Sequence, residues 1–468
     1  MFSIGSRFRL TIFGQSHSRA IGGVLEGIPA GTRLDLDAIR AFSARRAPGR
    51  ELTTPRTEAD EPVLLSGVDE RNVCCGAPLA FQIENTDTRP RDYARLRDVP
   101  RPMHSDYAAA VRYHGFNDIR GGGQFSGRLT APLCFAGAIA AGLLSERGIA
   151  VGSHVASVGP VDDERFDPLN VGAEQLASLR KMTLPVLSER AGNAMRALIE
   201  EVRADGDSVG GTIECAAVGL PAGWGDPIFD GVENLLARAL FAIPAVKGVE
   251  FGAGFDSARM RGSAHNDAFE IGDAGSIRTR SNRHGGILGG ITTGMPLVFR
   301  AAIKPTPSIA IEQDSVSLSR RENVKLTVAG RHDPCIALRA YPTVEAAAAL
   351  VLADLMMDEG TAGERKMDLQ CARTAIDRID REMVGLLCER MRLAAEVAAY
   401  KRENGLPVGD PAREREILER AAENAGPELA RYIEAFYAAV FQISKGYQAE
   451  LIAAAPSAGR PEKGACTD

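Results

Sequence analysis

Three short segments of this 468-residue chain combine side chains that could bind an anion and move a proton. Residues 330–335 read Gly-Arg-His-Asp-Pro-Cys, so a guanidinium, an imidazole and a carboxylate stand side by side. Single histidines occur in residues 13–18, Phe-Gly-Gln-Ser-His-Ser, and in residues 101–106, Arg-Pro-Met-His-Ser-Asp. Histidine is the simplest general acid near neutral pH because its unperturbed pKa is about 6.5. Together the segments favour proton transfer on an anionic substrate, although residues 330–335 alone are equally typical of a charged turn.

The overall composition is that of a globular protein with two domains. Its length exceeds what one hydrophobic core usually supports, and its 45% hydrophobic and 25% charged residues are typical of a water-soluble chain. No run of about 18 apolar residues predicts a membrane span, and the N-terminus lacks the features of a secretory signal. The eight cysteines form no Cys-x-x-Cys pair, so we expect a reduced, cytoplasmic protein without a metal site.

The charge distribution favours a small anionic partner over a polymer. A net charge of −6 argues against bulk binding of nucleic acid. Two arginine clusters nevertheless suit a small polyanion, with a solvated surface as the alternative for each. The clusters are Arg40, Arg45, Arg46, Arg50 and Arg56, and Arg89, Arg91, Arg95, Arg97 and Arg101.

The first 357 residues have the pattern of an α+β domain with antiparallel sheets. Residues 8–13, 211–218 and 296–303 are predicted strands, and residues 132–146 and 344–357 are predicted buried helices. No Gly-x-Gly-x-x-Gly motif follows a strand, so a Rossmann site has no support.

The remainder of the chain has the pattern of a helical domain. Residues 358–367 are polar and read as a linker, and residues 368–402 form an amphipathic helix about 50 Å long. Asp410 is placed to cap a second helix that begins at Pro411, and a third helix is expected over residues 427–454, before a disordered tail at 456–468. The other two helices of the same chain cannot cover so long a helix, so this domain should pair with a second copy of itself. Its apolar stripe comprises Ile376, Ile379, Met383, Leu386, Leu387, Leu393, Val397 and Tyr400.

In chain order, residues 13–18, 101–106 and 330–335 resemble chorismate synthase over about residues 1–357, with residues 120–128 (Arg-Gly-Gly-Gly-Gln-Phe-Ser-Gly-Arg) between the second and third segments. The resemblance implies a 1,4-elimination of phosphate from 5-enolpyruvylshikimate 3-phosphate, giving chorismate. His17 would then protonate the departing phosphate, His104 would act as an acid toward a reduced flavin, and Asp333 would help the flavin N5 to take the ring proton. The oxyanion-binding residues would be Arg46, Arg50 and Arg331.

The same resemblance implies reduced FMN as cofactor. Because no nicotinamide-site fingerprint occurs in the sequence, we expect an external reductase or reductant to supply it. The family usually has Glu, Gly and Arg where this chain has Gln15, Ser18 and Gln124, so we expect activity with FMN held more weakly or differently. The other histidines, His114, His154, His265, His284 and His332, are interpreted as structural. The flavin contacts carried over are Gln124, Phe125, Ser126, Pro244, Ala245, Gly289, Lys304, Pro305, Thr306, Pro307, Ser308 and Arg331.

The helical part resembles the all-helical class of chorismate mutase, over about residues 368–451 of a domain that extends to 455. That enzyme holds a dianion in its reactive conformer and stabilises the breaking ether bond. Arg390 and Lys401 are about 20° apart around a helix, whereas Arg373 is about 100° from Arg390, which predicts that Arg373 enters the pocket of a partner chain. By the resemblance, catalysis would use Arg373, Arg390, Lys401, Glu414 and Gln448, and substrate binding would use Asp410, Arg413 and Ser444.

The two resemblances fit consecutive reactions, because the product of the first is the substrate of the second. We therefore expect a bifunctional cytoplasmic enzyme of aromatic amino-acid biosynthesis, acting on small anionic substrates without nucleic acid or membrane. It should form an intertwined dimer through the mutase helices and a tetramer through the synthase domain. The alternatives are a helical domain that is a regulatory ligand-binding module, that serves only oligomerisation, or that has isochorismate lyase activity.

Overall fold

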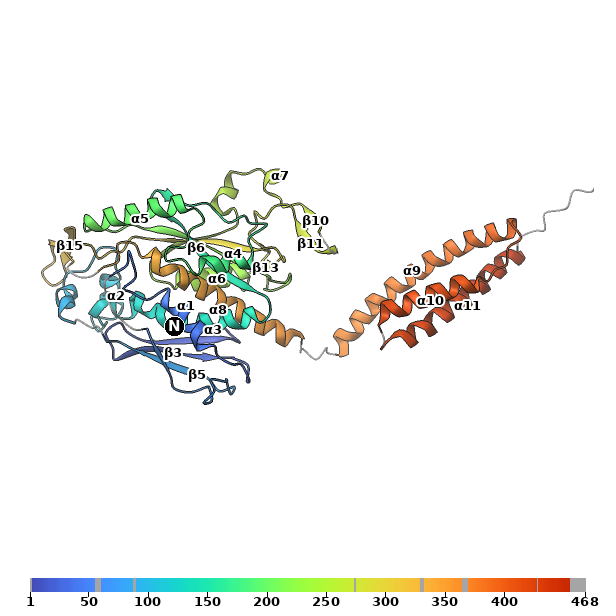
Figure 1. Ribbon diagram of the computed structural model, residues 1–468, viewed down its shortest axis with the longest axis horizontal. Helices are drawn as coiled ribbons and strands as arrows, with labels where there is room; N and C mark the ends of the chain where they lie inside the picture. The colour runs from blue at the N-terminus through green and yellow to red at the C-terminus, as the bar shows by residue number, and fades with distance from the viewer. Residues whose placement is uncertain are drawn as a thin grey trace, which may run out of the picture. The chain divides into compact units, whose positions relative to one another are not determined.

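The chain forms two compact units, Met1–Gly363 and Glu364–Asp468 (Figure 1). The structure is a computed structural model that describes residues 2–54, 60–86, 90–272, 275–328, 332–363, 369–426 and 428–454.

Two five-stranded antiparallel sheets form the frame of the first unit. The first, in the order β1-β2-β3-β5-β4, comprises Ser3–Ile4, Arg9–Gly14, Ala20–Glu26, Leu79–Glu84 and Pro62–Leu64. The second, in the order β7-β6-β8-β14-β9, comprises Val161–Asp162, Ala150–Val158, Gly211–Val218, Leu297–Ile303 and Val246–Phe251. The predicted strands over 8–13, 211–218 and 296–303 are confirmed as β2, β8 and β14, and the α+β class is confirmed.

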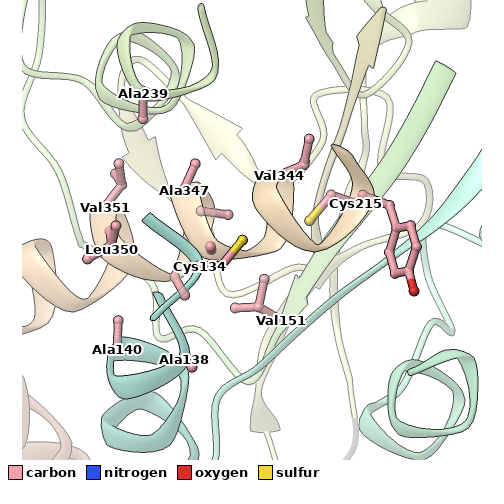
Figure 2. Packing of buried hydrophobic residues seen from close by; sticks show 14 of the residues in the cluster. Cys134, Ala138, Ala140, Val151, Cys215, Ala239, Val344, Ala347, Leu350 and Val351 are labelled. Carbon is pink, nitrogen blue, oxygen red and sulfur yellow. The ribbon is translucent and has the colours of Figure 1, made fainter. Parts of the chain in front are cut away.

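Two apolar helices, α3 (Thr130–Ser145) and α8 (Ala337–Gly363), pack against each other in the core. Helix α3 contacts β2 and β3 of the first sheet, and α8 contacts β6 and β8 of the second (Figure 1). A Cβ atom at Gly137 would lie 2.3 Å from the Cβ of Ala346, so glycine lets the two helices approach closely. Figure 2 shows this packing, with Cys134 and Ala138 on one side and Ala347 and Leu350 on the other.

The same two helices are long and apolar enough to cross a membrane by length and composition alone. The spans in question, Gly127–Ser145 and Ala337–Asp358, are 67% and 78% buried inside the fold, as expected for core helices. Helix α8 also continues to Gly363, past the start of the expected linker at 358. Residues 364–368 lie outside the described part of the chain.

Shorter elements complete the first unit. Its other α-helices are α1 (Leu36–Ala44), α2 (Asp106–Arg112), α4 (Ala173–Leu179), α5 (Glu189–Ala204), α6 (Val232–Phe241) and α7 (Gly262–His265). Its hairpins are β10–β11 (Phe269–Ile271, Ile277–Thr279), β12–β13 (Ile287–Leu288, Ile291–Thr292) and β15–β16 (Gln313–Ser317, Glu322–Leu326). Its 3-10 segments are Pro90–Arg97, Arg120–Phe125, Gly127–Leu129 and Gly254–Arg259.

The second unit consists of α9 (Leu369–Glu403), α10 (Pro411–Ala425) and α11 (Ala430–Ala454). The Asp410 side chain accepts a hydrogen bond of 3.1 Å from the backbone N–H of Arg413, which confirms the predicted cap. The third helix begins at Ala430 rather than at 427, and both α9 and α10 pack on α11. The predicted tail at 456–468 lies outside the described residues.

The apolar stripe of α9 is largely uncovered within one chain. Leu386 is 67% exposed and Tyr400 is 62% exposed, whereas core side chains of the first unit are almost fully buried. The stripe members that the structure describes are all among its exposed large apolar residues, namely Ile379, Met383, Leu386, Leu387, Leu393, Val397 and Tyr400. A contiguous exposed apolar face of this length is typical of a protein interface.

Candidate active sites

A cavity of about 340 Å³ in the first unit brings together most of the predicted synthase residues. Its lining includes His104, Asp333, Arg46, Phe125, Ser126, Pro244, Ala245, Lys304, Thr306, Pro307 and Ser308. The residues lining it within the described part of the chain do not include His17, Arg50, Gln124, Gly289 or Pro305. Arg331 lies outside the described residues.

A run of three glycines lies directly against both predicted acids, His17 and His104. Gly121, Gly122 and Gly123 have φ values of +62°, +106° and +54°, which side-chain-bearing residues rarely adopt. A Cβ atom on Gly121 would lie 2.3 Å from Cε1 of His17, and one on Gly122 would lie 3.2 Å from Nε2 of His104. The bare backbone therefore gives each imidazole the space that it occupies.

His17 lies against the wall of the cavity rather than in its lining. Its ring contacts Gly121 and stands edge-on to the ring of Tyr93, with 5.1 Å between centroids, and both of these neighbours line the cavity. Its Nδ1 atom is 3.1 Å from Oγ of Ser16, which donates to the carbonyl oxygen of Arg120. These contacts hold the ring beside the glycine run.

The residues that depart from the family pattern stabilise the turn that carries His17. The Ser18 hydroxyl accepts from the backbone N–H of Gln15 at 3.0 Å and lies 2.8 Å from the Gln15 carbonyl oxygen. The Asn85 amide donates to the carbonyl oxygens of Gln15 and Ser18, at 3.1 and 2.8 Å. Ser18 therefore adds hydrogen bonds within the turn that carries His17.

His104 is held by a buried acid and a buried arginine. Its Nδ1 atom is 2.5 Å from Oδ1 of Asp106, and Arg101 donates to the same carboxylate at 2.8 and 2.9 Å. Burial alone would raise the pKa of the Asp106 carboxyl, but hydrogen bonds from Arg101 and His104 outweigh it, so the pKa lies well below its usual range. An ionised Asp106 fixes the orientation of the imidazole and leaves Nε2 at the glycine run.

Asp333 is buried at the cavity between a backbone donor and a guanidinium. Its carboxylate accepts from the backbone N–H of Thr54 at 2.9 Å and from Arg339 at 2.8 Å. Arg339 also donates to the carbonyl oxygen of Arg46 at 3.0 Å. Burial lowers the pKa of Arg339, and the neighbouring Arg46 lowers it further.

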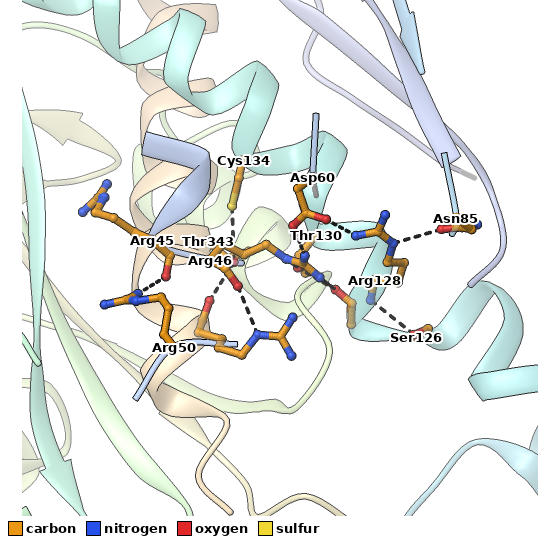
Figure 3. A network of polar contacts seen from close by, with 12 residues as sticks. Arg45, Arg46, Arg50, Asp60, Asn85, Ser126, Arg128, Thr130, Cys134 and Thr343 are labelled. Carbon is orange, nitrogen blue, oxygen red and sulfur yellow. Dashed lines mark hydrogen bonds and ion pairs between the residues drawn. The ribbon is translucent and has the colours of Figure 1, made fainter. Parts of the chain in front are cut away.

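One wall of the cavity carries more positive than negative charge (Figure 3). The Arg46 guanidinium donates to Thr130 at 2.9 Å and to the Gly127 carbonyl oxygen at 2.9 Å, and it pairs with Asp60 at 2.5 Å. Arg128 pairs with the same Asp60. Burial would raise the pKa of the Asp60 carboxyl, but the two guanidiniums hold it below its usual range. Two buried cations sharing one carboxylate leave a net positive wall suited to an oxyanion.

Arg50 turns away from this wall, although it is only four residues from Arg46. Its guanidinium donates to the carbonyl oxygens of Arg45 and Thr183, the latter at 2.7 Å (Figure 3). Sequence reasoning gave no role to Arg128 or Arg339, which do line the cavity. The sequence could have indicated Arg128, because it is the last residue of the glycine-containing segment 120–128, which resembles the chorismate synthase family.

His154 lies away from the cavity, as its structural interpretation predicts, whereas His332, which received the same interpretation, lines the cavity. His154 is fully buried, with Nδ1 3.1 Å from Asp163 and Nε2 3.0 Å from Glu214. Burial would lower the pKa of its imidazole, but the two carboxylates outweigh that effect and raise it. The imidazolium therefore links β6 to β8 and to the segment after β7, away from the cavity.

The second unit places several predicted mutase residues on facing helices. Arg390 of α9 lies over the Phe441 ring of α11 at 5.8 Å, and its buried NH1 atom has no hydrogen-bond partner among the described residues. Ser444 and Gln448, on the same face of α11 as Phe441, are buried and joined by a 3.2 Å hydrogen bond. The buried Oε1 atom of Gln448 also lacks a partner within the described part. Unpaired buried polar atoms at one helix interface are typical of a ligand site.

The remaining predicted mutase residues lie around the start of α10. Lys401 donates to the carbonyl oxygen of Val408 at 2.6 Å, and Glu414 pairs with Lys445 at 3.1 Å. Arg413 pairs with Glu416 on the exposed side of α10. Arg373 lies in α9, and its side chain is outside the described residues, so its position in a pocket stays a prediction.

Comparison with known proteins matches each of the two units to a protein family. Residues 8–357 match the chorismate synthase family and residues 372–449 match the chorismate mutase type II family. Chorismate synthase of Dehalococcoides mccartyi is 45% identical over 359 residues, which cover 76% of this chain and 97% of that protein. The chorismate synthase of Lancefieldella parvula is 42% identical over 364 residues, covering 76% of this chain and 96% of that protein. A crystal structure of chorismate synthase, 28% identical, superposes with a TM-score of 0.58 over 76% of this chain and 93% of that chain.

Proposed function

This chain belongs to the chorismate synthase family and continues into a chorismate mutase type II domain, and from this premise we propose that it catalyses two consecutive reactions. The first eliminates phosphate from 5-enolpyruvylshikimate 3-phosphate to give chorismate. The second rearranges chorismate to prephenate, in the biosynthesis of aromatic amino acids. The observation that carries the first assignment is the cavity where His104, Asp333 and an arginine wall meet beside His17.

In the elimination, the C–O bond to phosphate and a ring C–H bond break. Arg46 and Arg128 hold the phosphate in this proposal, which is supported by the positive charge that remains beside the cavity when two guanidiniums share one carboxylate. His17 donates a proton to the departing phosphate. Asp333 accepts a hydrogen bond from Arg339, which also donates to the carbonyl oxygen of Arg46. Asp333 assists removal of the ring proton.

The cavity residues also fit a reduced flavin, which members of this family use. The Oγ1 atom of Thr306 is buried in the lining with no partner among the described residues, so it is available to a bound polar group. Burial and the charge of Lys247 both lower the pKa of Lys304, so an anionic phosphate beside it would be stabilising. We propose FMN held by Phe125, Ser126, Pro244, Ala245 and the segment 304–308. When bound, the reduced flavin supplies electron density to the substrate during the elimination.

The synthase assignment is tested by removing the proposed acid. His17→Ala should lower the rate of phosphate release by about 10²-fold, the usual contribution of a general acid, with dithionite-reduced FMN saturating and oxygen excluded. His265→Ala, which changes a histidine that does not line the cavity, serves as the control. Turnover of His17→Ala near that of the control would refute the role.

We propose that the second unit acts as an intertwined dimer, supported by the exposed apolar stripe of α9. Arg373→Ala and Lys401→Ala should each nearly abolish mutase activity, because each removes a cation from a dianion site. Unfolding and refolding the two variants together should restore part of it, since a mixed dimer has one pocket with both defects and one intact pocket. No recovery in confirmed heterodimers would place Arg373 in its own chain's pocket.

The finer features of the assembly belong to the same proposal. Burial of the α9 stripe requires at least a dimer, and we propose a tetramer formed through the synthase unit as well. Reduced FMN would come from an external reductase or reductant, because no nicotinamide-binding fingerprint occurs in the sequence. A cytoplasmic location suits this supply and the free cysteines that the structure describes.

A further inference from the structure

Lys445 of α11 forms an ion pair with a residue of the proposed mutase site. Its Nζ atom lies 3.1 Å from Oε2 of Glu414, in the first turn of α10. The two side chains are only 34% and 28% exposed. Sequence reasoning gave Lys445 no role.

The backbone around Lys445 directs its side chain toward the site. A Cβ atom at Gly409 would lie 3.9 Å from Cδ of Lys445, so the lysine stem passes beside the turn that precedes α10. Lys401 reaches the same turn from α9 and donates to the carbonyl oxygen of Val408. Side chains from all three helices therefore converge at this turn.

The position of Lys445 along α11 also places it at the edge of the site. It directly follows Ser444 and precedes Gln448 by three residues, and residues three apart are neighbours on a helix surface. Ser444 and Gln448 are buried and hydrogen-bonded to each other. Lys445 thus borders the buried polar pair while its ammonium reaches Glu414.

The charge of Glu414 poses a problem for a site that binds a dianion. A carboxylate in the pocket repels the two carboxylates of chorismate, and the repulsion grows as the site is desolvated. A cation in contact with Glu414 cancels most of this repulsion and fixes where the carboxylate lies. We propose that Lys445 is a positioning residue of the mutase site, which holds Glu414 at the α10 turn and neutralises its charge toward the dianionic substrate.

This inference rests on the proposed mutase function of the second unit. A surface ion pair without function is the competing interpretation, because exposed pairs generally contribute little. The two interpretations differ in what they predict for substrate affinity. Only the positioning role makes removal of the lysine charge weaken chorismate binding, and only while Glu414 retains its own charge.

The test measures kcat and KM for chorismate in the full-length protein at low ionic strength. Lys445→Met should raise KM by about fivefold, the upper range for a partly exposed pair. Lys445→Arg should restore KM, because it keeps the charge. Arg420→Met, which removes an exposed cation from α10, controls for the change in net charge. The synthase activity of each sample verifies that the chain is folded.

A double-mutant cycle shows whether the lysine acts through Glu414. In a Glu414→Gln background, Lys445→Met should leave KM unchanged. The same rise in KM in both backgrounds would show that Lys445 contacts substrate directly and would overturn the positioning role. So would a Lys445→Met variant that behaves like Arg420→Met, or a Lys445→Arg variant as impaired as Lys445→Met. Absence of mutase activity in the unmodified protein would instead refute the proposed mutase function, and this inference with it.

Discussion

Replacing Gly121 by alanine should disable the synthase site by displacing His17. The φ of +62° at Gly121 costs an alanine about 1–2 kcal/mol, because its Cβ crowds the following carbonyl oxygen. The new Cβ would also lie 2.3 Å from Cε1 and 2.5 Å from Nδ1 of His17. Carbon atoms in contact are about 3.5 Å apart, so the ring must retreat by about 1 Å. A displacement of that size lowers turnover by on the order of 10²-fold when the displaced group is catalytic.

The matched control is Gly31→Ala, which carries the backbone strain without the clash. Gly31 has a φ of +89°, and no heavy atom lies within 4 Å of its added Cβ. Both variants should lose free energy of unfolding through the backbone strain, followed through the fluorescence of Trp224, the only tryptophan in the chain. Only Gly121→Ala should lose phosphate release with reduced FMN saturating, while mutase activity stays unchanged in both. Equal synthase rates in the two variants would refute the placement of a catalytic His17 on the glycine run.

Two further predictions concern other residues of the first unit. Arg46→Lys should raise KM for the phosphorylated substrate by about tenfold or more, because lysine cannot keep the three contacts of the guanidinium. Arg50→Lys should change this KM by less than about twofold. Similar KM values for the two variants would show that the cavity wall is wrongly assigned. The raised pKa of His154 stabilises the fold fully below the unfolded-state value of about 6.5, and this contribution is lost as pH rises through the folded-state pKa. The free energy of unfolding reported by Trp224 should therefore fall above about pH 6.5, and His154→Gln should remove that dependence; a variant with an unchanged pH profile would contradict the buried imidazolium.

The sequence predicted those features that depend on local pattern. Strand β8 was predicted with its observed bounds, since a short, mostly apolar segment lies there between turn signals. The cap at Asp410 followed from its position before Pro411. The meeting of His104 and Asp333 in one cavity came from the family resemblance, because no local pattern links residues so far apart.

What the sequence did not predict depends on contacts between distant segments. Arg46 and Arg50 are the same residue type and lie four positions apart. Of the two, only Arg46 forms hydrogen bonds with Asp60 and with Thr130 at the start of α3. The glycine run gave only a weak signal, because its purpose depends on which side chains pack against it. The ion pair of Glu414 with Lys445 joins two residues that are 31 positions apart and lie on different helices, and neither shows in its own helical pattern that it will meet the other.

The most direct test of two consecutive activities uses the unmodified full-length protein. It is given 5-enolpyruvylshikimate 3-phosphate and dithionite-reduced FMN without oxygen, and phosphate, chorismate and prephenate are followed in the same sample. We predict that prephenate forms in the same amount as phosphate, with chorismate appearing only transiently. Release of phosphate while chorismate accumulates and no prephenate forms would contradict the mutase assignment, and absence of phosphate release would contradict the synthase assignment.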